Sequence, residues 1–255
     1  MLALERQKKI LEFLNTDGVV SVNRLSSTLG VTEETVRRDL EKLEKQESLR
    51  RTHGGAVPVE GSTHEFSLEK RKNLNVEAKQ KIAREAAKMV VDGDTIFLDA
   101  STTTFFMAKE LKTRKNLTVI TNSLRVVTEL SGCEYIKVIL VGGVLSRNQS
   151  FVGRLAEKSI EEDYFANKMF FSSKGITADV GILESNESES GIKQRMFENS
   201  NEKYYLCDNG KIGGVGFVKL ASIGEIDFLI TNATLDDRLK EKLAESEVEI
   251  VQISE

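Results

Sequence analysis

The chain has 255 residues, of which 40% are hydrophobic and 30% are charged, and its formal net charge at pH 7 is −4. This composition is that of a soluble globular protein and excludes a disordered chain. The length suits one very small domain beside one of ordinary size. Charges near the N-terminus exclude a signal peptide, and no apolar run approaches the ~18 residues of a membrane span. A cytoplasmic protein with no membrane partner is therefore expected.

Several kinds of chemistry are also excluded. The two cysteines, Cys133 and Cys207, are too few for a disulfide framework and are predicted to be packing residues. The two histidines, His53 and His64, both lie in the first quarter of the chain, and no CxxC, HxxxH or acidic calcium loop occurs. The patterns GxxxxGK[ST] and GxGxxG are absent as well. We therefore expect no metal, no cofactor, and neither a nucleoside triphosphate nor a dinucleotide.

Residues 1–57 predict three short helices followed by a hairpin. Apolar residues recur at helical spacing in each helix. Ser21 and Thr32 are placed to cap the second and third helices, and Gly30 suits the left-handed position between them. The stretch "SLRRTHGGAVPV" predicts two strands around a Gly54–Gly55 turn. Together these elements predict a winged helix-turn-helix, which is a DNA-binding domain.

The third helix is predicted to present its polar face to a major groove. Val36, Leu40 and Leu43 define its core side, so that Arg38 and Lys42 point away from the core. The N-terminal half of such a helix reaches base edges, and hairpin side chains reach phosphates or a minor groove. The candidate DNA-binding residues are Thr32, Thr35, Arg37, Arg38, Lys42, Arg50, Arg51 and His53.

An ordinary solvated helix face is the alternative, because six basic and six acidic residues lie between positions 32 and 55. Asp39 falls near the core side and is predicted to orient a neighbouring arginine. Arg37 sits on the flank of the helix and has two candidate partners, Asp39 and a DNA phosphate.

Residues 58–75 are polar, contain Pro58, and predict a linker that becomes helical toward its end. From 76 to 255, continuous apolar strands alternate with helices, which is typical of an α/β domain with a mostly parallel sheet covered on both faces. The predicted strands are 95–99, 117–122, 136–143, 168–173, 203–208, 227–232 and 248–253. The predicted helices are 77–90, 103–111, 124–131, 154–163, 188–199 and 235–245.

Ligands of open α/β sheets bind outside the carboxyl ends of the strands. Polar residues or glycines stand at the carboxyl ends of six of the predicted strands, namely Asp99, Asn122, Gly142–Gly143, Ser172–Ser173, Asp208 and Asn232. Turn formation explains part of this pattern, but six exits in a row predict a ligand crevice.

The stretch "LDASTTTFFMAKEL" places Ser101, Thr102, Thr103 and Thr104 at a predicted helix start. Free amides and hydroxyls there predict a phosphate site, and simple helix capping is the alternative. Lys211 follows Asp208 by three residues and is predicted to cover the same crevice. Glu189 and Lys193 are further candidates, although their acidic stretch also suits a solvated loop.

The small unit closely resembles the N-terminal domain of the deoxyribose-operon-repressor (DeoR) family. The matching features are Arg6, Ile10 and Leu14, then Thr32, Thr35 and Val36–Leu40, then His53–Gly55. The resemblance continues through the large unit at Asp99–Thr103, Thr121–Ser123, Val141–Gly143, Ser150–Gly153, Glu189 with Lys193, and Asp208 with Lys211. The sequence departs from the family pattern at Arg154, Ser172, Ser190, Gly210 and Asn232, which bear on the identity of the effector.

The resemblance implies a sensor domain that looks like ribose-5-phosphate isomerase in fold and binds a phosphorylated sugar or a related metabolite. The effector-binding residues that it implies are Asp99, Ser101, Thr102, Thr103, Asn122, Gly142, Gly143, Gly153, Glu189, Lys193, Asp208 and Lys211. It further implies a repressor of a sugar-uptake or sugar-catabolism operon that binds a double-stranded DNA operator. A homo-oligomer, dimer or tetramer, is expected because half-sites are read in pairs.

A sugar-phosphate isomerase with an accessory N-terminal domain is the alternative function. Isomerisation needs a base near the carbonyl-bearing carbons and an electrophile on the oxygen, which Asp99, Glu189, Asp208 and the lysines could supply. No acid–base pair has a spacing that singles it out, however, and an isomerase has no use for a wing with paired arginines. We therefore predict a regulator and not an enzyme.

Overall fold

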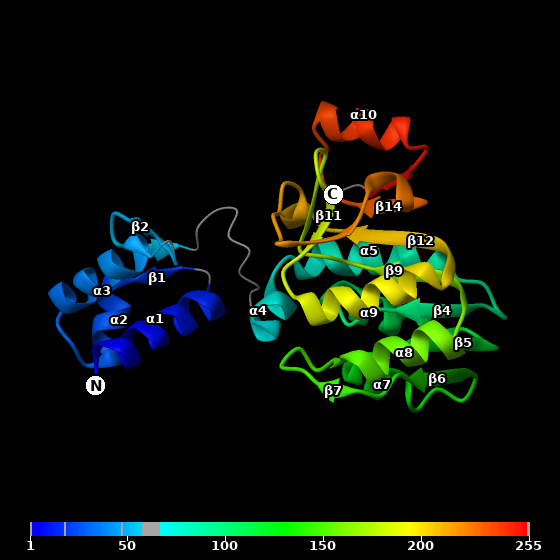
Figure 1. Cartoon of the computed structure of the whole chain (residues 1–255), viewed down its shortest axis with the longest axis horizontal. Helices are drawn as coiled ribbons and strands as arrows, with labels where there is room; N and C mark the ends of the chain where they lie inside the picture. Colours follow the sequence, from blue (N-terminus) through cyan, green and yellow to red (C-terminus); the bar gives the residue numbers. More distant parts are fainter. Residues whose placement is uncertain (1, 18, 47, 58–66, 254–255) are drawn as a thin grey trace. The chain divides into compact units, whose positions relative to one another are not determined.

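The computed structural model of the chain describes residues 2–17, 19–46, 48–57 and 67–253. The chain divides into two compact units, Met1–Leu74 and Asn75–Glu255 (Figure 1). The elements of the smaller unit are α1 (Ala3–Asp17), β1 (Val20–Ser21), α2 (Val22–Leu29), α3 (Glu33–Lys45), β2 (Arg50–Thr52), β3 (Gly55–Val57) and α4 (Leu68–Asn73). Part of the predicted linker, 58–66, lies outside the described residues, and α4 occupies much of the rest.

The smaller unit is a winged helix-turn-helix, as predicted. Ser21 caps α2 by accepting a hydrogen bond from the Arg24 N–H, and Gly30 ends that helix in the left-handed region with φ 64°. Thr32 caps α3 in the same way through the Thr35 N–H. Apolar side chains of the three helices and of the sheet form one buried core, which includes Ile10, Leu14, Leu25, Val36, Leu40, Leu43 and Leu49. This core fixes α3 against the wing.

The position predicted for the wing turn was wrong. The turn lies at His53–Gly54, and Gly55 is the first residue of β3. The short strand β1, which the sequence pattern did not reveal, pairs with β3 so that Ser21 lies opposite Gly55. A Cβ atom on Gly55 would lie 1.8 Å from the carbonyl oxygen of Val20, so only glycine allows this pairing. Gly55 therefore serves strand contact and not turn conformation.

The larger unit is built on a seven-stranded parallel sheet in the order β15-β14-β12-β9-β4-β5-β6. Its strands are β4 (Thr95–Leu98), β5 (Leu117–Thr121), β6 (Ile136–Leu140), β9 (Ala166–Phe171), β12 (Ser200–Cys207), β14 (Phe228–Thr231) and β15 (Glu249–Gln252). Its helices are α5 (Val76–Lys88), α6 (Thr102–Glu110), α7 (Leu124–Leu130), α8 (Arg154–Asp163), α9 (Glu187–Glu198) and α10 (Asp237–Glu245). The predicted seven strands and six helices are thus confirmed, with ends that move by a few residues.

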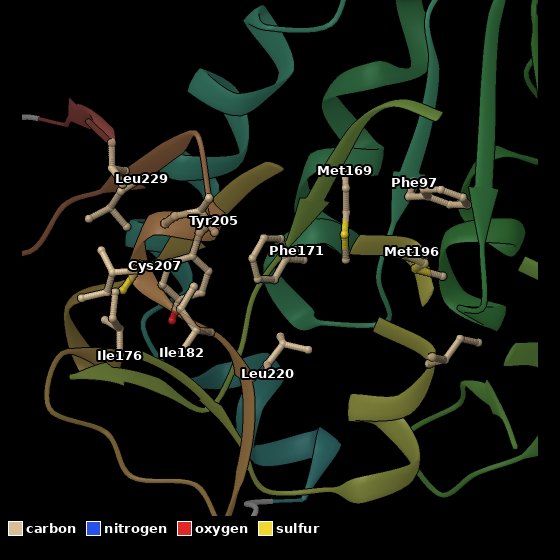
Figure 2. Close-up of a cluster of buried hydrophobic side chains, with 14 of the residues drawn as sticks. Phe97, Met169, Phe171, Ile176, Ile182, Met196, Tyr205, Cys207, Leu220 and Leu229 are labelled. Carbon is tan, nitrogen blue, oxygen red and sulfur yellow. The ribbon is translucent and has the colours of Figure 1, made fainter. Parts of the chain in front are cut away.

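Two apolar clusters bury the two faces of this sheet. Side chains of α5, α6 and α7 pack on one face, where they meet Ile96 and Leu98 of β4. Side chains of α8, α9 and α10 pack on the other face, where Phe97 of the same strand points. Figure 2 shows this second cluster, with Met169 and Phe171 of β9 beside Met196 of α9. Successive residues of a strand are therefore both buried, which explains the continuous apolar runs.

The sequence pattern did not reveal several short elements. These are the hairpin β7 (Val144–Leu145) with β8 (Phe151–Val152), the antiparallel sheet of β10 (Gly175–Thr177), β11 (Gly181–Glu184) and β13 (Val218–Ala221), and the 3-10 turns η1 (Leu111–Thr113), η2 (Asn209–Lys211) and η3 (Ile223–Glu225). The small antiparallel sheet adds Ile176, Ile182 and Leu220 to the cluster of Figure 2, which also holds Cys207. Cys133 packs against the opposite cluster, so both cysteines are packing residues.

Candidate DNA-binding surface and effector site

The predicted DNA-binding residues lie on α3 and on the wing. Thr32 and Thr35 stand at the start of α3, where their hydroxyls are 2.9 Å apart and bond one another. Arg38 and Lys42 are exposed along the same helix, and Arg50, Arg51 and His53 are exposed on β2 and its turn. Because one core fixes helix and wing, these side chains form one surface.

Most of the cations on this surface already have carboxylate partners. Arg37 pairs with Glu33 and Arg38 with Glu34, each at 3.2 Å, and the Arg51 Nε donates to Glu44 at 2.7 Å. The side chain of Arg38 remains 75% exposed, and that of its partner Glu34 67%. Exposed pairs of this kind contribute only about 0–1 kcal/mol, so they can open when a phosphate or a base edge approaches.

Arg37 faces the wing. It lines a hollow together with Glu44 of α3 and with Arg51, Thr52 and His53 of the wing. Arg37 therefore lies beside the wing cations and does not pair with Asp39.

Asp39 is bound from another helix. Its carboxylate is 3% exposed and accepts hydrogen bonds from Arg6 Nε at 2.5 Å and from Gln7 Nε2 at 2.9 Å, both on α1. The predicted neighbouring arginine is thus Arg6, which is distant in sequence. Asp39 ties α3 to α1 and takes no part in the exposed surface.

In the larger unit, the six predicted strand exits lie at one edge of the sheet, because their strands are all parallel. The strand order reverses between the adjacent strands β4 and β9. The chain runs outward from β4 to β6, returns to β9, and then runs outward the other way to β15. Asp99 follows β4 at this point, and one of its oxygens accepts the Ser172 N–H at 3.1 Å from the exit of β9. Such a reversal of strand order is where open α/β sheets bind ligands.

A buried ion cluster lies beneath this edge. Lys193 of α9 donates to Glu184 at 2.5 Å and to the Ser172 carbonyl at 2.6 Å, and it lies 3.0 Å from Asp99. Burial alone would lower the pKa of Lys193, but Glu184 and Asp99 outweigh burial and raise it. Burial likewise opposes ionisation of Asp99, yet Lys193 and the hydroxyls of Thr104 and Ser101 lower its pKa. Lys193 and Asp99 are therefore both charged at neutral pH.

At the start of α6, some hydroxyl groups cap or brace the helix, and other hydrogen-bond donors have no partner within it. The Ser101 side chain caps the helix through the Thr104 N–H, and the Thr104 hydroxyl bonds Asp99 at 2.7 Å. Two of the four hydroxyl residues thus have structural roles. The first amides of a helix have no partner within it, and the buried Thr103 hydroxyl has none among the described residues. Thr102 and Thr103 are the residues left to meet an anion.

Other buried polar atoms at the same edge also lack partners within the described part of the chain. They are the side-chain oxygens of Asn122, Ser185 and Ser190. Asn122 follows β5, Ser185 lies just before α9, and Ser190 lies near the start of that helix. A buried polar atom without a hydrogen bond costs about 1–3 kcal/mol. A polar ligand or ordered water at this edge would offset that cost.

Glu189 joins α9 to the β7–β8 hairpin. Its carboxylate accepts hydrogen bonds from the hydroxyls of Ser150 and Ser146. Gly142 and Gly143 are exposed between β6 and β7, and Gly153 precedes α8. Glu189 thus positions the β7–β8 hairpin. The sequence pattern had not revealed this hairpin.

Asp208 and Lys211 frame the other side of the edge. Asp208 is 3% exposed, and its Oδ1 accepts hydrogen bonds from Asn75 Nδ2 at 2.6 Å and from the Gly210 N–H at 3.1 Å. The Lys211 ammonium donates to the Ser173 carbonyl at 2.5 Å. The sequence offered no signal for Asn75, which lies 133 positions from Asp208.

Comparison with known proteins bears directly on these two units. Residues 6–61 match the family model described as "DeoR-like helix-turn-helix domain", and residues 74–233 match "DeoR C terminal sensor domain". The chain belongs to the DeoR family. As the sequence predicted, it is a DNA-binding transcriptional regulator and not an enzyme.

Relatives in the DeoR family span almost the whole chain. The uncharacterized HTH-type transcriptional regulator YulB of Bacillus subtilis (strain 168) is 44% identical over 99% of this chain and 98% of its own length. The HTH-type transcriptional regulator GlpR of Haloferax volcanii is 34% identical over 98% of each chain. The L-fucose operon activator of Haemophilus influenzae is 34% identical over 92% of this chain and 94% of its own.

A solved structure, ribose 5-phosphate isomerase A of Methanocaldococcus jannaschii, aligns with a TM-score of 0.41 and 19% identity over 54% of this chain and 55% of that one. A likeness of this extent says nothing about function. No helix within the described ranges is both long and apolar enough to cross a membrane. Those ranges also contain no group of three or more His, Cys, Asp or Glu residues that could hold a metal ion.

Proposed function

We propose that this DeoR-family regulator represses a sugar-uptake or sugar-catabolism operon from the cytoplasm and is controlled by a phosphorylated sugar. It binds a double-stranded operator through α3 and the wing as a dimer or tetramer. The effector binds at the carboxyl edge of the parallel sheet. The buried polar atoms without partners at this edge, on Thr103, Asn122 and Ser190, carry the effector assignment.

On the DNA side, Arg38 is the residue assigned to base edges. It lies in the N-terminal half of α3, and its partner among the described residues is Glu34, in an exposed ion pair. Arg37, Arg51 and His53 line one hollow between helix and wing, which suits a backbone phosphate. Thr32 and Thr35 would exchange their mutual hydrogen bond for contacts with DNA.

Substitution of Arg38 tests this assignment. Loss of a bidentate contact with guanine costs roughly 1–3 kcal/mol, so Arg38→Ala should weaken binding to the promoter of the protein's own gene by about 5- to 150-fold. Fluorescence anisotropy with labelled promoter DNA measures this change. Lys88→Ala is the matched control, because Lys88 also pairs with a carboxylate on an exposed helix face, that of α5 in the larger unit. Equal affinities of the two variants would refute the role of Arg38.

On the effector side, the phosphate is assigned to the start of α6. The amides and hydroxyls of Thr102 and Thr103 provide donors there, and helix dipoles favour an anion at that end. Lys211 adds a positive charge, while Asp208 and Asn122 provide acceptors for sugar hydroxyls. We also assign Asp99, Ser101, Gly142, Gly143, Gly153, Glu189 and Lys193 to the site, where several of them position its walls.

A thermal-shift panel tests the effector site. Ribose 5-phosphate, glucose 6-phosphate, fructose 6-phosphate and fructose 1-phosphate are compared with inorganic phosphate and with the free sugars. At least one sugar phosphate should raise the Tm of the wild-type chain, and Thr102→Ala should lose that shift. A shift that survives the Thr102 substitution would place the phosphate elsewhere, and a panel without any shift would refute a sugar-phosphate effector.

A further inference from the structure

The side chain of Asn75 links the edge of the sheet to the junction between the two units. Asn75 is the first residue of the larger unit and directly follows Leu74, the last residue of the smaller one. Its Nδ2 donates a hydrogen bond to Oδ1 of Asp208, at the effector edge, over 2.6 Å. Asp208, which is proposed to bind the effector, is thus hydrogen-bonded to the residue at which the chain enters the larger unit.

This hydrogen bond depends on a glycine. A Cβ atom on Gly210 would lie 2.7 Å from Asn75 Nδ2 and 3.1 Å from Asp208 Oδ1. The Gly210 N–H also donates to the same carboxylate oxygen. Gly210 therefore makes room for the Asn75 amide and holds the carboxylate that receives it.

The backbone of Asn75 is in an uncommon state. It adopts φ 50° and ψ 39° in the left-handed region, which only a few per cent of residues other than glycine occupy. Asn75 precedes α5, yet its side chain makes no capping bond with that helix. Asparagine is among the best N-cap residues and normally caps from the extended region. Asparagine is enriched in the left-handed region, and while its amide bonds Asp208 the side chain of Asn75 is not available to cap α5.

Two arrangements of Asn75 follow. In the structure, its amide bonds Asp208 and its backbone is left-handed; once released, its side chain would cap α5 from the extended region. Exchange between them changes φ from positive to negative at the residue where the chain enters the larger unit. A single residue of this kind can serve as a hinge.

Asp208 can respond to a ligand. Its second oxygen, Oδ2, accepts no hydrogen bond from the residues that the structure describes. In the coupling proposed below, a sugar hydroxyl that donates to Oδ2 draws the carboxylate round, so that Oδ1 moves away from Asn75 Nδ2. The 3-10 turn η2 ends in Lys211, so the same segment would also bind the effector phosphate.

We propose that Asn75 couples effector binding to DNA binding: an effector that engages Asp208 releases the Asn75 side chain, and the backbone of residue 75 then leaves the left-handed region. This inference rests on the proposed function. The effector shifts the equilibrium because it binds one arrangement more tightly than the other. Asn75 is a positioning residue and makes no contact with effector or DNA.

Asn75→Gly tests the coupling. Glycine keeps the left-handed region accessible and removes the whole side chain, including the amide that bonds Asp208. Asn116→Gly is the matched control, because Asn116 is also left-handed, with φ 52°, and is exposed before β5 at the opposite edge of the sheet. The probe is whichever of the four sugar phosphates raises the Tm of the wild-type chain most.

The expected result separates binding from response. Wild type and Asn116→Gly should both show a Tm rise with the probe and a roughly tenfold change in promoter affinity, which lies in the usual range of coupling between sites. Asn75→Gly should keep a Tm rise but change its promoter affinity less than about twofold. Hydrogen exchange of residues 67–79 should respond to the probe in wild type and not in Asn75→Gly.

Other results would overturn the inference or the function beneath it. If Asn75→Gly keeps the full change in promoter affinity, or loses the Tm rise altogether, Asn75 does not couple the two sites. If no sugar phosphate shifts the wild-type Tm, the proposed function itself fails, and the inference fails with it.

Discussion

Lys193 shows how one buried charge can organise a site without being part of its surface. Its ammonium group has three hydrogens, and three acceptors lie within 3.0 Å of it: Glu184, the Ser172 carbonyl and Asp99. No donor is left for an effector while these contacts persist. The resemblance to the DeoR family placed Lys193 among effector-binding residues, and its geometry now favours a role beneath the site. The likeness identified the residue, but sequence alone could not show its depth.

Loss of Lys193 should destabilise the larger unit. Lys193→Met leaves Asp99 and Glu184 as buried carboxylates without their cation, which costs about 3–5 kcal/mol in comparable cases. Urea unfolding of the full chain measures the loss. Lys88→Met is the control, because its exposed pair with Glu85 contributes at most about 1 kcal/mol. Similar losses in both variants would mean that the cluster is not held by charge.

The stability difference between wild type and Lys193→Met should also depend on pH. The folded pKa of Asp99 is lowered, so its contribution is complete above its unfolded value of about 3.9 and falls as the pH drops through the folded value. The folded pKa of Lys193 is raised, so its contribution is complete below about 10.4 and falls at more alkaline pH. Urea unfolding at successive pH values should show a constant difference between about pH 5 and 9 and a smaller one below pH 4. A difference that persists at pH 2 would contradict this.

At the scale of elements, the wing depends on a three-stranded sheet that holds β2 and its cations beside α3. The middle strand, β3, pairs with β1 on one side and with β2 on the other. β1 lies so close to Gly55 that a Cβ atom there would be 1.8 Å from the Val20 carbonyl oxygen. The orientation of Arg50 and Arg51 therefore depends on a residue that carries no side chain.

Two adjacent glycines allow a controlled test of the wing. Gly55→Ala forces β1 away from β3 and should cost about 1–3 kcal/mol, as overpacking typically does. It should also weaken promoter binding, because the wing cations move. In Gly54→Ala the added methyl group meets no atom within 4 Å, so stability and promoter affinity should stay close to those of wild type. Calorimetry and anisotropy measure both effects, and equal behaviour of the two variants would refute the role of the β1–β3 pairing.

The sequence predicted the helices and strands that are long enough to leave an apolar pattern. It did not predict the shortest strands. The inner strands of the parallel sheet, such as β4, β5 and β14, are buried on both faces, which leaves a continuous apolar run in the sequence. Strands such as β7, β8 and β10 have only two or three residues and leave no comparable pattern. The strand exits of the candidate site were predictable for the same reason as the strands. Their partners were not, because Arg6 with Asp39 and Asn75 with Asp208 are distant in sequence and only the fold brings them together.

At the scale of the whole molecule, the net charge of −4 is unevenly distributed. Residues 1–74 contain 13 basic and 12 acidic side chains, whereas residues 75–255 contain 23 and 28. The negative charge thus belongs to the larger unit, which repels DNA and leaves contact with it to the winged helix-turn-helix. An acidic chain and a polyanionic partner are therefore compatible.

The central claim is that one chain binds its operator through the smaller unit and adjusts that affinity through a sugar phosphate in the larger one. The most direct measurement is an anisotropy titration of promoter DNA by the full chain, with and without each sugar phosphate, between 50 and 200 mM salt. We predict affinity that falls linearly with salt on logarithmic axes and a roughly tenfold change with at least one sugar phosphate. Affinity that no sugar phosphate alters, together with turnover of ribose 5-phosphate that Asp99→Ala abolishes, would contradict the claim.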